Sequence, residues 1–417
     1  MIAEWNGAEI ARSADCIVCD STIYFPRADL RREFIRPGIF RSHCPRKGDA
    51  EYFDLSVNGR GLTHAAWHYP APAADFAELT NHVAFWRGVE VREAESSRAP
   101  HQSGANTGDP AELIRAFVSR VPKTEIHLRL ETFATGDAPL DPAALVRAAR
   151  DYLQRNRVFY AEIFWAPAFY ASSGKKYDAL ADALDAAAQR IKNEDRVHIK
   201  FLTDVSQSDG LPAAEKILES LLAYPRDTII GVANSGPETA PGKSARTYAP
   251  VFERARAAGL HVVSMAGEMF GPSHVWDALN ATGVERLGHA TSAILDERLL
   301  DHLRERQLPL TICLSSNTTT RAYVHELREH PVRAFFERGL NVTLNSDCPA
   351  ITGAELTDEY MNLHKFCGFD LNEIILLMRN NLNATFLSPR NKLNCWKQIE
   401  DRIRSLQTEL QLQITVP

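Results

Sequence analysis

The sequence lacks any run that approaches the roughly 20 apolar residues needed to span a membrane as a helix. It also lacks an excess of positive charge, because 47 Lys and Arg residues stand against 53 Asp and Glu residues and the net charge is −6. Without a basic surface for a polyanion, neither a nucleic acid nor a membrane is expected as a partner. The segment MIAEWNGAEIARSAD has no basic stretch followed by an apolar one, so no export signal is predicted.

Cysteine is scarce as well. Seven cysteines, odd in number and widely scattered through 417 residues, do not form a disulfide framework, and a reducing cytoplasm is the expected setting. The remaining composition, 45% hydrophobic and 24% charged, is that of a globular protein. The length allows two or three domains, of which one could be a barrel of about 250 residues.

A linker divides the chain into two unequal units. Residues 93–110 are polar, rich in Ser, Gly and Pro, and without hydrophobic periodicity. Residues 1–92 contain short β-type runs, such as residues 52–57, and the turn signal Asn58-Gly59, so a small β-rich domain is predicted there. The one helix expected in this unit covers residues 75–87.

Strand and helix patterns alternate through residues 111–390. The strand-like runs begin near Glu125, Val158, Val197, Thr228, His261, Val284, Leu310 and Asn341. The helical patterns between them include residues 141–153, 177–191, 213–222 and 248–258. Eight strands, most of them followed by a helix, predict an α/β fold of the (β/α)8 barrel type. A doubly wound open sheet is the alternative, weakened because no Gly-x-Gly-x-x-Gly follows a strand.

The tail, residues 391–417, predicts a C-terminal helix with one apolar stripe. Trp396, Ile399, Ile403, Leu406 and Leu410 follow helical spacing. We expect this stripe to pack on the barrel or on a sister subunit, and the second arrangement would make a homodimer.

Ionisable and polar residues gather where the predicted strands end. Catalytic groups of a barrel sit at the carboxyl ends of its strands, so these residues predict a site for a small-molecule substrate. They are His127, Arg129 and Glu131 after the first strand, Asn234 and Gly236 after the fourth, Glu268 after the fifth, His289 after the sixth, Asn317 after the seventh, and Asp347 and Cys348 after the eighth.

The same strings carry a resemblance. PKTEIHLRLE, MAGE, RLGHATSAI, CLSSN and VTLNSDCPAI followed by LTDEY resemble, in this order, the adenosine and adenine deaminase family of the amidohydrolase superfamily. That family has a (β/α)8 barrel, in agreement with the strand count. The N-terminal motifs WNGAEIARS, HCPRKG and NHVAFW resemble a small bacterial β-domain of unknown function, which makes the chain a fusion protein.

The resemblance implies a set of site residues. The family holds zinc with a His-x-His pair on the first strand, a His on the fifth and an Asp on the eighth, and the zinc activates a water molecule. His127 and Asp347 match zinc ligands, Glu268 the proton-shuttling Glu, and His289 the His that orients the hydroxide. Substrate contacts are expected from Gly236, Glu131, His127, Asn317 and Cys348.

Three positions depart from the family pattern. Arg129 replaces the second His, Met265 the fifth-strand His, and Cys348 the second Asp of the eighth-strand pair. Arginine has no lone pair to donate and methionine is a poor zinc ligand, so no metal is expected, while a zinc set rearranged around His289 and Cys348 stays open. Arg129 is expected to replace the metal through a direct ion pair with Asp347.

Three functions follow from this pattern. The first is a metal-independent acid–base enzyme, with Glu268, His289, Asp347 and Arg129 as catalytic residues, acting on a nucleobase-like or amidine-containing molecule of a specialised, secondary-metabolic pathway. The second is a non-catalytic module that binds a purine-like ligand or acts as a scaffold. The third is a zinc-dependent deaminase with the rearranged ligand set. The long helical cover that the family places after the first strand is largely missing, which predicts an open pocket.

Overall fold

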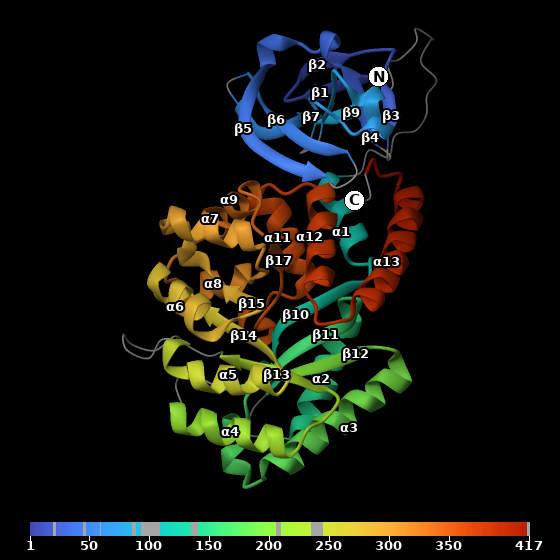
Figure 1. The fold of residues 1–417 in the computed structure, drawn as a ribbon. Helices are drawn as coiled ribbons and strands as arrows, with labels where there is room; N and C mark the ends of the chain where they lie inside the picture. Colours follow the sequence, from blue (N-terminus) through green and yellow to red (C-terminus); the bar gives the residue numbers. More distant parts are fainter. Residues whose placement is uncertain are drawn as a thin grey trace. The chain divides into compact units, whose positions relative to one another are not determined.

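The chain forms two compact units in the computed structural model, Met1–Ala105 and Asn106–Pro417 (Figure 1). The structure describes residues 1–19, 22–44, 47–58, 60–85, 89–92, 109–134, 141–205, 210–234 and 245–414. Among these residues, no helix combines the length and the apolar character required to cross a membrane.

The N-terminal unit is built from two antiparallel sheets, which confirms the β-rich prediction. The smaller sheet has the order β2 (Ala8–Arg12), β1 (Ile2–Trp5), β9 (Glu90–Arg92). The larger has the order β3 (Ile17–Cys19), β4 (Thr22–Pro26), β8 (His82–Phe85), β7 (Arg60–His68), β6 (Gly48–Val57), β5 (Ile35–Cys44). Asn58 follows β6 with φ 50°, and Val57 at the end of β6 pairs with Arg60 at the start of β7, where the Asn-Gly signal predicts a turn.

The helix predicted over residues 75–87 is wrong. A short 3₁₀ segment, Ala74–Leu79, is interrupted at Phe76, and Asn81 then takes a left-handed conformation with φ 60°. The strand β8 follows and pairs with β4 on one side and β7 on the other. Three consecutive residues of β8 are buried, so its sequence carries no alternation that would distinguish it from a buried helix.

The second unit is a barrel of eight parallel strands, as predicted. Its strands are β10 (Lys123–Arg129), β11 (Val158–Trp165), β12 (His198–Asp204), β13 (Ile229–Asn234), β14 (His261–Ala266), β15 (Arg286–His289), β16 (Leu310–Ile312) and β17 (Val342–Leu344). They are hydrogen-bonded in sequence order, and each begins within two residues of its predicted start. This order is the one that right-handed strand–helix–strand units produce.

The first and last strands close the barrel through a short seam. The backbone N–H of Asp347 donates to the carbonyl of His127 at 2.8 Å, and the N–H of Arg129 donates to the carbonyl of Asp347 at 2.9 Å. Next to these bonds, the side-chain oxygen of Asn345 accepts a hydrogen bond from the N–H of Ile126 at 3.1 Å. Two side-chain positions of the site are therefore fixed to each other by the closure itself.

Helices surround the strands (Figure 1). They are α1 (Pro110–Val118), α2 (Pro142–Arg155), α3 (Tyr177–Asp195), α4 (Leu211–Ala223), α5 (Ala249–Ala257), α6 (Pro272–Thr282), α7 (Glu297–Arg306), α8 (Leu314–Thr320), α9 (Val332–Glu337), α10 (Pro349–Thr352), α11 (Leu356–Cys367), α12 (Leu371–Asn383) and α13 (Pro389–Leu410). The predicted apolar stripe of the tail lies on α13, and Trp396, Ile399, Ile403 and Leu406 are buried in the same core as the barrel strands.

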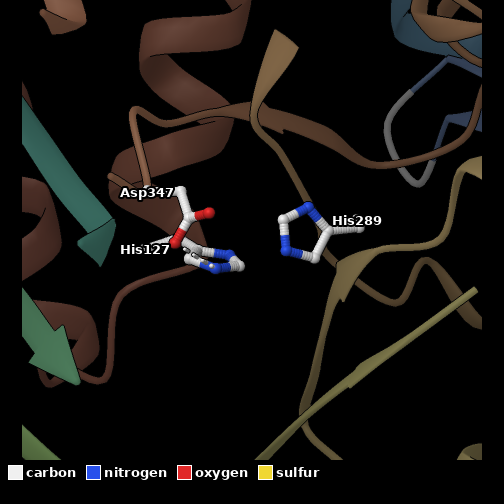
Figure 2. Close-up of side chains that lie close together, drawn as sticks. All are labelled: His127, His289 and Asp347. Atoms are coloured by element: carbon white, nitrogen blue, oxygen red, sulfur yellow. Dashed lines mark ion pairs between the residues drawn. The ribbon is translucent and has the colours of Figure 1, made fainter. Parts of the chain in front are cut away.

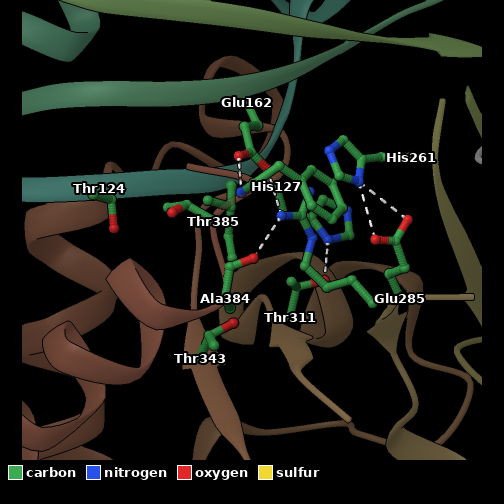
Figure 3. A network of polar contacts seen from close by, with 12 residues as sticks. Thr124, His127, Glu162, His261, Glu285, Thr311, Thr343, Ala384 and Thr385 are labelled. Atoms are coloured by element: carbon green, nitrogen blue, oxygen red, sulfur yellow. Dashed lines mark hydrogen bonds and ion pairs between the residues drawn. The ribbon is translucent and has the colours of Figure 1, made fainter. Parts of the chain in front are cut away.

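A buried ion pair joins two strands of the barrel; Figure 3 labels Glu162, His261 and Ala384 of the network around it. Arg286 of β15 binds Glu162 of β11, and both side chains are completely buried. Arg286 also donates to the carbonyl of Ala384 at 3.0 Å and lies 4.4 Å above the Phe386 ring. The Phe386 ring stacks on His261 with 3.8 Å between ring centroids. These contacts tie the segment after α12 to the strands β11, β14 and β15.

Replacing Arg286 with Met should destabilise the protein by about 3–5 kcal/mol, because Glu162 is left as a buried charge without its partner. The matched control is Arg190→Met on α3, whose partner Glu194 is half exposed and where a loss below about 1 kcal/mol is expected. Urea unfolding of both variants measures the difference. Equal losses would contradict a structural role for the buried pair.

Candidate active site

Three buried side chains converge at the carboxyl ends of the barrel strands. His127 comes from β10, His289 is the last residue of β15, and Asp347 follows β17. Their exposed fractions are 0%, 1% and 5%. The His127 and His289 rings lie 4.9 Å apart between centroids, and His127 Nε2 lies 3.6 Å from Asp347 Oδ1. Figure 2 shows His289 facing the other two across a common space.

Two of these residues sit in strained backbone turns. His289 has φ 62°, and the N–H of the next residue, Ala290, donates to the carbonyl of Gly288 at 2.9 Å. Asp347 has φ 57°, and the N–H of Cys348 donates to the carbonyl of Ser346 at 2.8 Å. Such γ-turns with positive φ are rare for residues with a side chain. Strain of this kind clusters at functional sites, and here it turns both side chains at the ends of their strands.

His127 and Asp347 each present a hydrogen-bond acceptor, Nε2 and Oδ1, to the space between them. The Thr311 hydroxyl donates to Leu287 and lies 2.7 Å from His127 Nδ1, so Nδ1 carries the proton and Nε2 a lone pair. Oδ2 of Asp347 accepts from the Ser316 hydroxyl at 2.7 Å. His127 Nε2 and Asp347 Oδ1 are buried and have no hydrogen-bond partner in the described part of the chain. Such acceptors require a donor or a cation between them.

The charges of the site are settled by burial and by neighbours. Burial lowers the pKa of His127 well below its ordinary value, so the imidazole is neutral. Burial opposes ionisation of Asp347, but the positive charge that the neighbouring imidazoles carry when protonated, together with Arg129 and the Ser316 hydroxyl, outweighs it, and the pKa of Asp347 is lowered. The site therefore contains an ionised carboxylate beside a neutral ring.

Glu268 and Asn317 complete the cluster next to His289. Glu268 Oε2 lies 3.5 Å from His289 Nε2. The Asn317 amide nitrogen lies 3.0 Å from Glu268 Oε1 and 2.9 Å from His289 Nδ1, while its oxygen lies 3.1 Å from His330 Nε2. The amide of Asn317, predicted to contact substrate, is thus engaged by three protein side chains.

Arg129 does not form the predicted ion pair with Asp347. Within the described ranges, its guanidinium makes neither a hydrogen bond nor an ion pair, and Asp347 Oδ1 has no hydrogen-bond partner there. Burial lowers the pKa of Arg129, but the charges of Asp204 and then Asp347 raise it more strongly. The prediction failed because a second acidic residue, Asp204 at the end of β12, also attracts the Arg129 guanidinium electrostatically.

The other predicted site residues are placed as follows. Glu131 lies in the 3₁₀ segment Leu130–Phe133, accepts from the N–H of Ala166 at 2.8 Å, and burial raises its pKa to about 7. Burial also raises the pKa of the Cys348 thiol, so this group is not a ready thiolate. Gly236 lies outside the described residues. Between Phe133 and β11, the described chain contains only α2, in line with the short connection expected there.

Sequence reasoning missed Glu359. This residue of α11 is completely buried, and both carboxyl oxygens accept from the N–H of Ser315 at the start of α8, at 3.2 and 3.3 Å. It thereby holds the helix that carries Ser316 and Asn317. The motif LTDEY contains this Glu, but a sequence alone does not show which backbone group it reaches.

The site offers a metal only part of the family's set of donors. The family set of four ligands does not fit, because Arg129 and Met265 occupy two of its positions. Three donors remain, since the ligating atoms of His127, His289 and Asp347 lie within 4.8 Å of one another. Cys348 is not part of this group. The group is the one arrangement of three that the described residues offer a metal.

An eight-stranded parallel barrel with histidines, Glu and Asp at its strand ends defines an enzyme of the amidohydrolase class. Residues 134–402 match the family described as adenosine deaminase. The chain belongs to the adenosine deaminase family, as its motifs predict. Residues 1–96 match a second family, described as Domain of unknown function (DUF427).

Individual relatives agree with this assignment. An aminodeoxyfutalosine deaminase of Streptomyces coelicolor is 33% identical over 328 residues, covering 78% of this chain and 83% of the relative. One from Streptomyces avermitilis is 31% identical over 353 residues, covering 84% and 97%. Among solved structures, adenine deaminase from Arthrobacter aurescens has a TM-score of 0.63 at 24% identity, covering 68% of this chain and 99% of the other. An amidohydrolase from Burkholderia ambifaria with bound Zn has a TM-score of 0.64 at 18% identity, covering 74% and 97%.

Glu359 should make folding stability depend on pH. Burial raises its pKa to about 8 from an ordinary value of 4.5, so between these values the unfolded chain has lost a proton that the folded protein still binds. The contribution of Glu359 to stability should therefore fall as pH rises from about 4.5 to about 8 and stay level above it.

Glu359→Gln removes this group and should reduce the loss of stability between these pH values by a few kcal/mol, of order 2.303RT times the pKa difference. The measurement is urea unfolding at pH 5 and pH 8. Glu194→Gln on the exposed face of α3 is the control and should keep the wild-type slope. An unchanged slope in Glu359→Gln would show that this carboxyl is already ionised at neutral pH.

Proposed function

We propose that the barrel performs metal-independent acid–base chemistry at an amidine carbon of an aminopurine-like small molecule. The observation that carries the proposal is the buried pair of acceptors, His127 Nε2 and Asp347 Oδ1, which lie 3.6 Å apart and receive no hydrogen bond from any residue that the structure describes. A water molecule has two O–H groups, and one can donate to each acceptor. Both acceptors favour loss of a proton from that water, because one is a neutral imidazole and the other an ionised carboxylate.

The reaction is a hydrolytic deamination. The oxygen of the bound water attacks the carbon that bears the amino group. The two protons of this water pass first to His127 or Asp347 and from there to the substrate. One proton reaches the adjacent ring nitrogen and the other the amino group. The carbon–nitrogen bond then breaks, so one water is consumed, one ammonia is released, and a carbonyl replaces the amidine.

Glu268 and His289 suit the proton transfers. Glu268 Oε2 and His289 Nε2 lie 3.5 Å apart beside the same space, so a proton can move between the substrate and either group. Arg129 lies two residues after His127 on β10, and alternate residues of a strand share a face. Its permanent charge would stabilise negative charge that develops on the attacked carbon's oxygen.

The substrate class rests on family membership and on relatives. The curated relatives are deaminases of adenosine and of aminodeoxyfutalosine by their names. The proposed substrate therefore presents an amino group on a purine-like ring. Glu131, beside the backbone N–H of Ala166, is the acidic residue that would bind its ribose or base.

A metal-dependent deaminase is the second candidate, favoured by the convergence of His127, His289 and Asp347. A divalent cation on these three residues would lower the pKa of a bound water. Arg129 argues against it, since it adds a permanent positive charge beside the same donors.

Elemental analysis separates the two candidates. Purified wild-type protein should hold less than about 0.1 zinc per chain, because two positions of the four-ligand set lack a donor. Arg129→His alone should not change this, since Met265 still leaves the set incomplete. The double variant Arg129→His with Met265→His should bind about one zinc per chain, because it supplies three histidines and Asp347. Tightly bound zinc in the wild type that is lost in His127→Ala would instead support the second candidate.

Turnover tests the reaction itself. Ammonia release should be measured for aminopurine nucleosides and related amidines with chelator present, and adenosine itself should not be deaminated at a normal enzymatic rate. At least one compound should be turned over by the wild type, at least 100-fold faster than by Glu268→Gln, which removes a proton-transfer group. Glu297→Gln, exposed on α7, is the control. Binding of these compounds without ammonia release would refute the enzyme and indicate a non-catalytic binding module.

A further inference from the structure

A chain of hydrogen bonds with one unambiguous direction leads to His289. It begins at the backbone N–H of Val332, which lies 3.0 Å from His330 Nδ1. A backbone N–H can only donate, so His330 Nδ1 must accept and carries no proton. His330 is 4% exposed, and burial lowers its pKa to about 3, so the ring is neutral. Its single proton is therefore on Nε2.

The next bond orients the Asn317 amide. His330 Nε2–H lies 3.1 Å from Asn317 Oδ1, which accepts. The amide nitrogen consequently faces Glu268 Oε1 at 3.0 Å and His289 Nδ1 at 2.9 Å. In this orientation the second N–H of the amide donates to Glu268 Oε1. Both N–H groups of the amide are thus used.

The last bond determines the state of the His289 ring. Because Asn317 donates to Nδ1, that nitrogen has a lone pair and the proton of the neutral ring is on Nε2. Nε2 lies 3.5 Å from Glu268 Oε2 and on the side of the ring that faces His127 and Asp347 (Figure 2). In this tautomer the ring presents a donor, and it offers a metal no lone pair at Nε2.

We propose that Asn317 and His330 are positioning residues that hold His289 in the Nε2–H tautomer, so that the ring donates a proton or hydrogen bond into the site. Neither residue needs to touch substrate for this role. The use of the proton rests on the proposed function, but the tautomer does not, because it is set by protein contacts alone. The same tautomer excludes His289 from the three-residue metal group unless the amide of Asn317 turns over.

Position 330 offers a matched pair of variants. His330→Gln can keep an N–H donor toward Asn317 Oδ1, so the amide and the His289 tautomer should stay as they are. His330→Glu places an acceptor there, which should turn the amide so that its oxygen faces His289 Nδ1. The proton of His289 should then move to Nδ1. A residue that merely supports the fold would not move a proton on a ring it does not contact.

Long-range proton–nitrogen NMR spectra of protein labelled with ¹⁵N in histidine report the tautomer of each ring without substrate. The His289 signals are identified by their loss in His289→Gln. We expect protonated Nε2 and unprotonated Nδ1 in the wild type and in His330→Gln, and the reverse in His330→Glu. If His330→Glu does not fold, Asn317→Asp serves the same purpose, because its carboxylate cannot donate to Nδ1.

A wild-type His289 with its proton on Nδ1, or one that exchanges between both tautomers, would overturn the proposal. So would identical His289 spectra in the Gln and Glu variants of His330. None of these outcomes depends on turnover. If the tautomer is as expected and no compound is deaminated, the proposed function fails while the positioning role stands.

Discussion

The barrel closure between β10 and β17 is the constraint on which the site depends. It consists of the backbone bonds that join His127, Arg129 and Asp347. These bonds place a histidine and a carboxylate on neighbouring strands at one height, with their polar atoms 3.6 Å apart. The strained turn at Asp347 is tolerated because its backbone is held on both sides by the first strand. Any change that loosens the seam would move both acceptors at once.

A second layer of polar contacts supports this arrangement from outside the pocket. Ser316 binds Asp347, Thr311 binds His127, and Asn317 binds both His289 and Glu268. Glu359 in turn holds the start of α8, which carries Ser316 and Asn317. The reacting groups are therefore oriented by side chains that substrate does not need to reach, as expected of a preorganised site.

Arg129 and Met265 distinguish this member of the family from the zinc pattern. The Arg129 guanidinium supplies a positive charge but cannot coordinate a water molecule, so it cannot generate a metal-bound hydroxide. It can stabilise a negative charge nearby. The negative charges of Asp204 and Asp347 both act on this guanidinium, which makes no direct ion pair within the described residues. The proposed chemistry depends on the positions of protons, and the proposed tautomer of His289 depends on the amide of Asn317.

The sequence by itself determined the barrel, its strand starts and the residues at the strand ends, because alternation of apolar runs and polar ends is a local property. It also predicts that two ligands of the family's zinc set are missing, since residue type alone excludes Arg and Met as zinc donors. It misassigned residues 75–87, where a strand buried on both faces has no periodicity to read. Only the tertiary structure decided that Arg129 does not pair with Asp347, that Glu359 reaches Ser315 and that Asn317 binds His289. Each of these is a contact between residues far apart in the chain, and its distance and direction are set by packing, which no local pattern encodes.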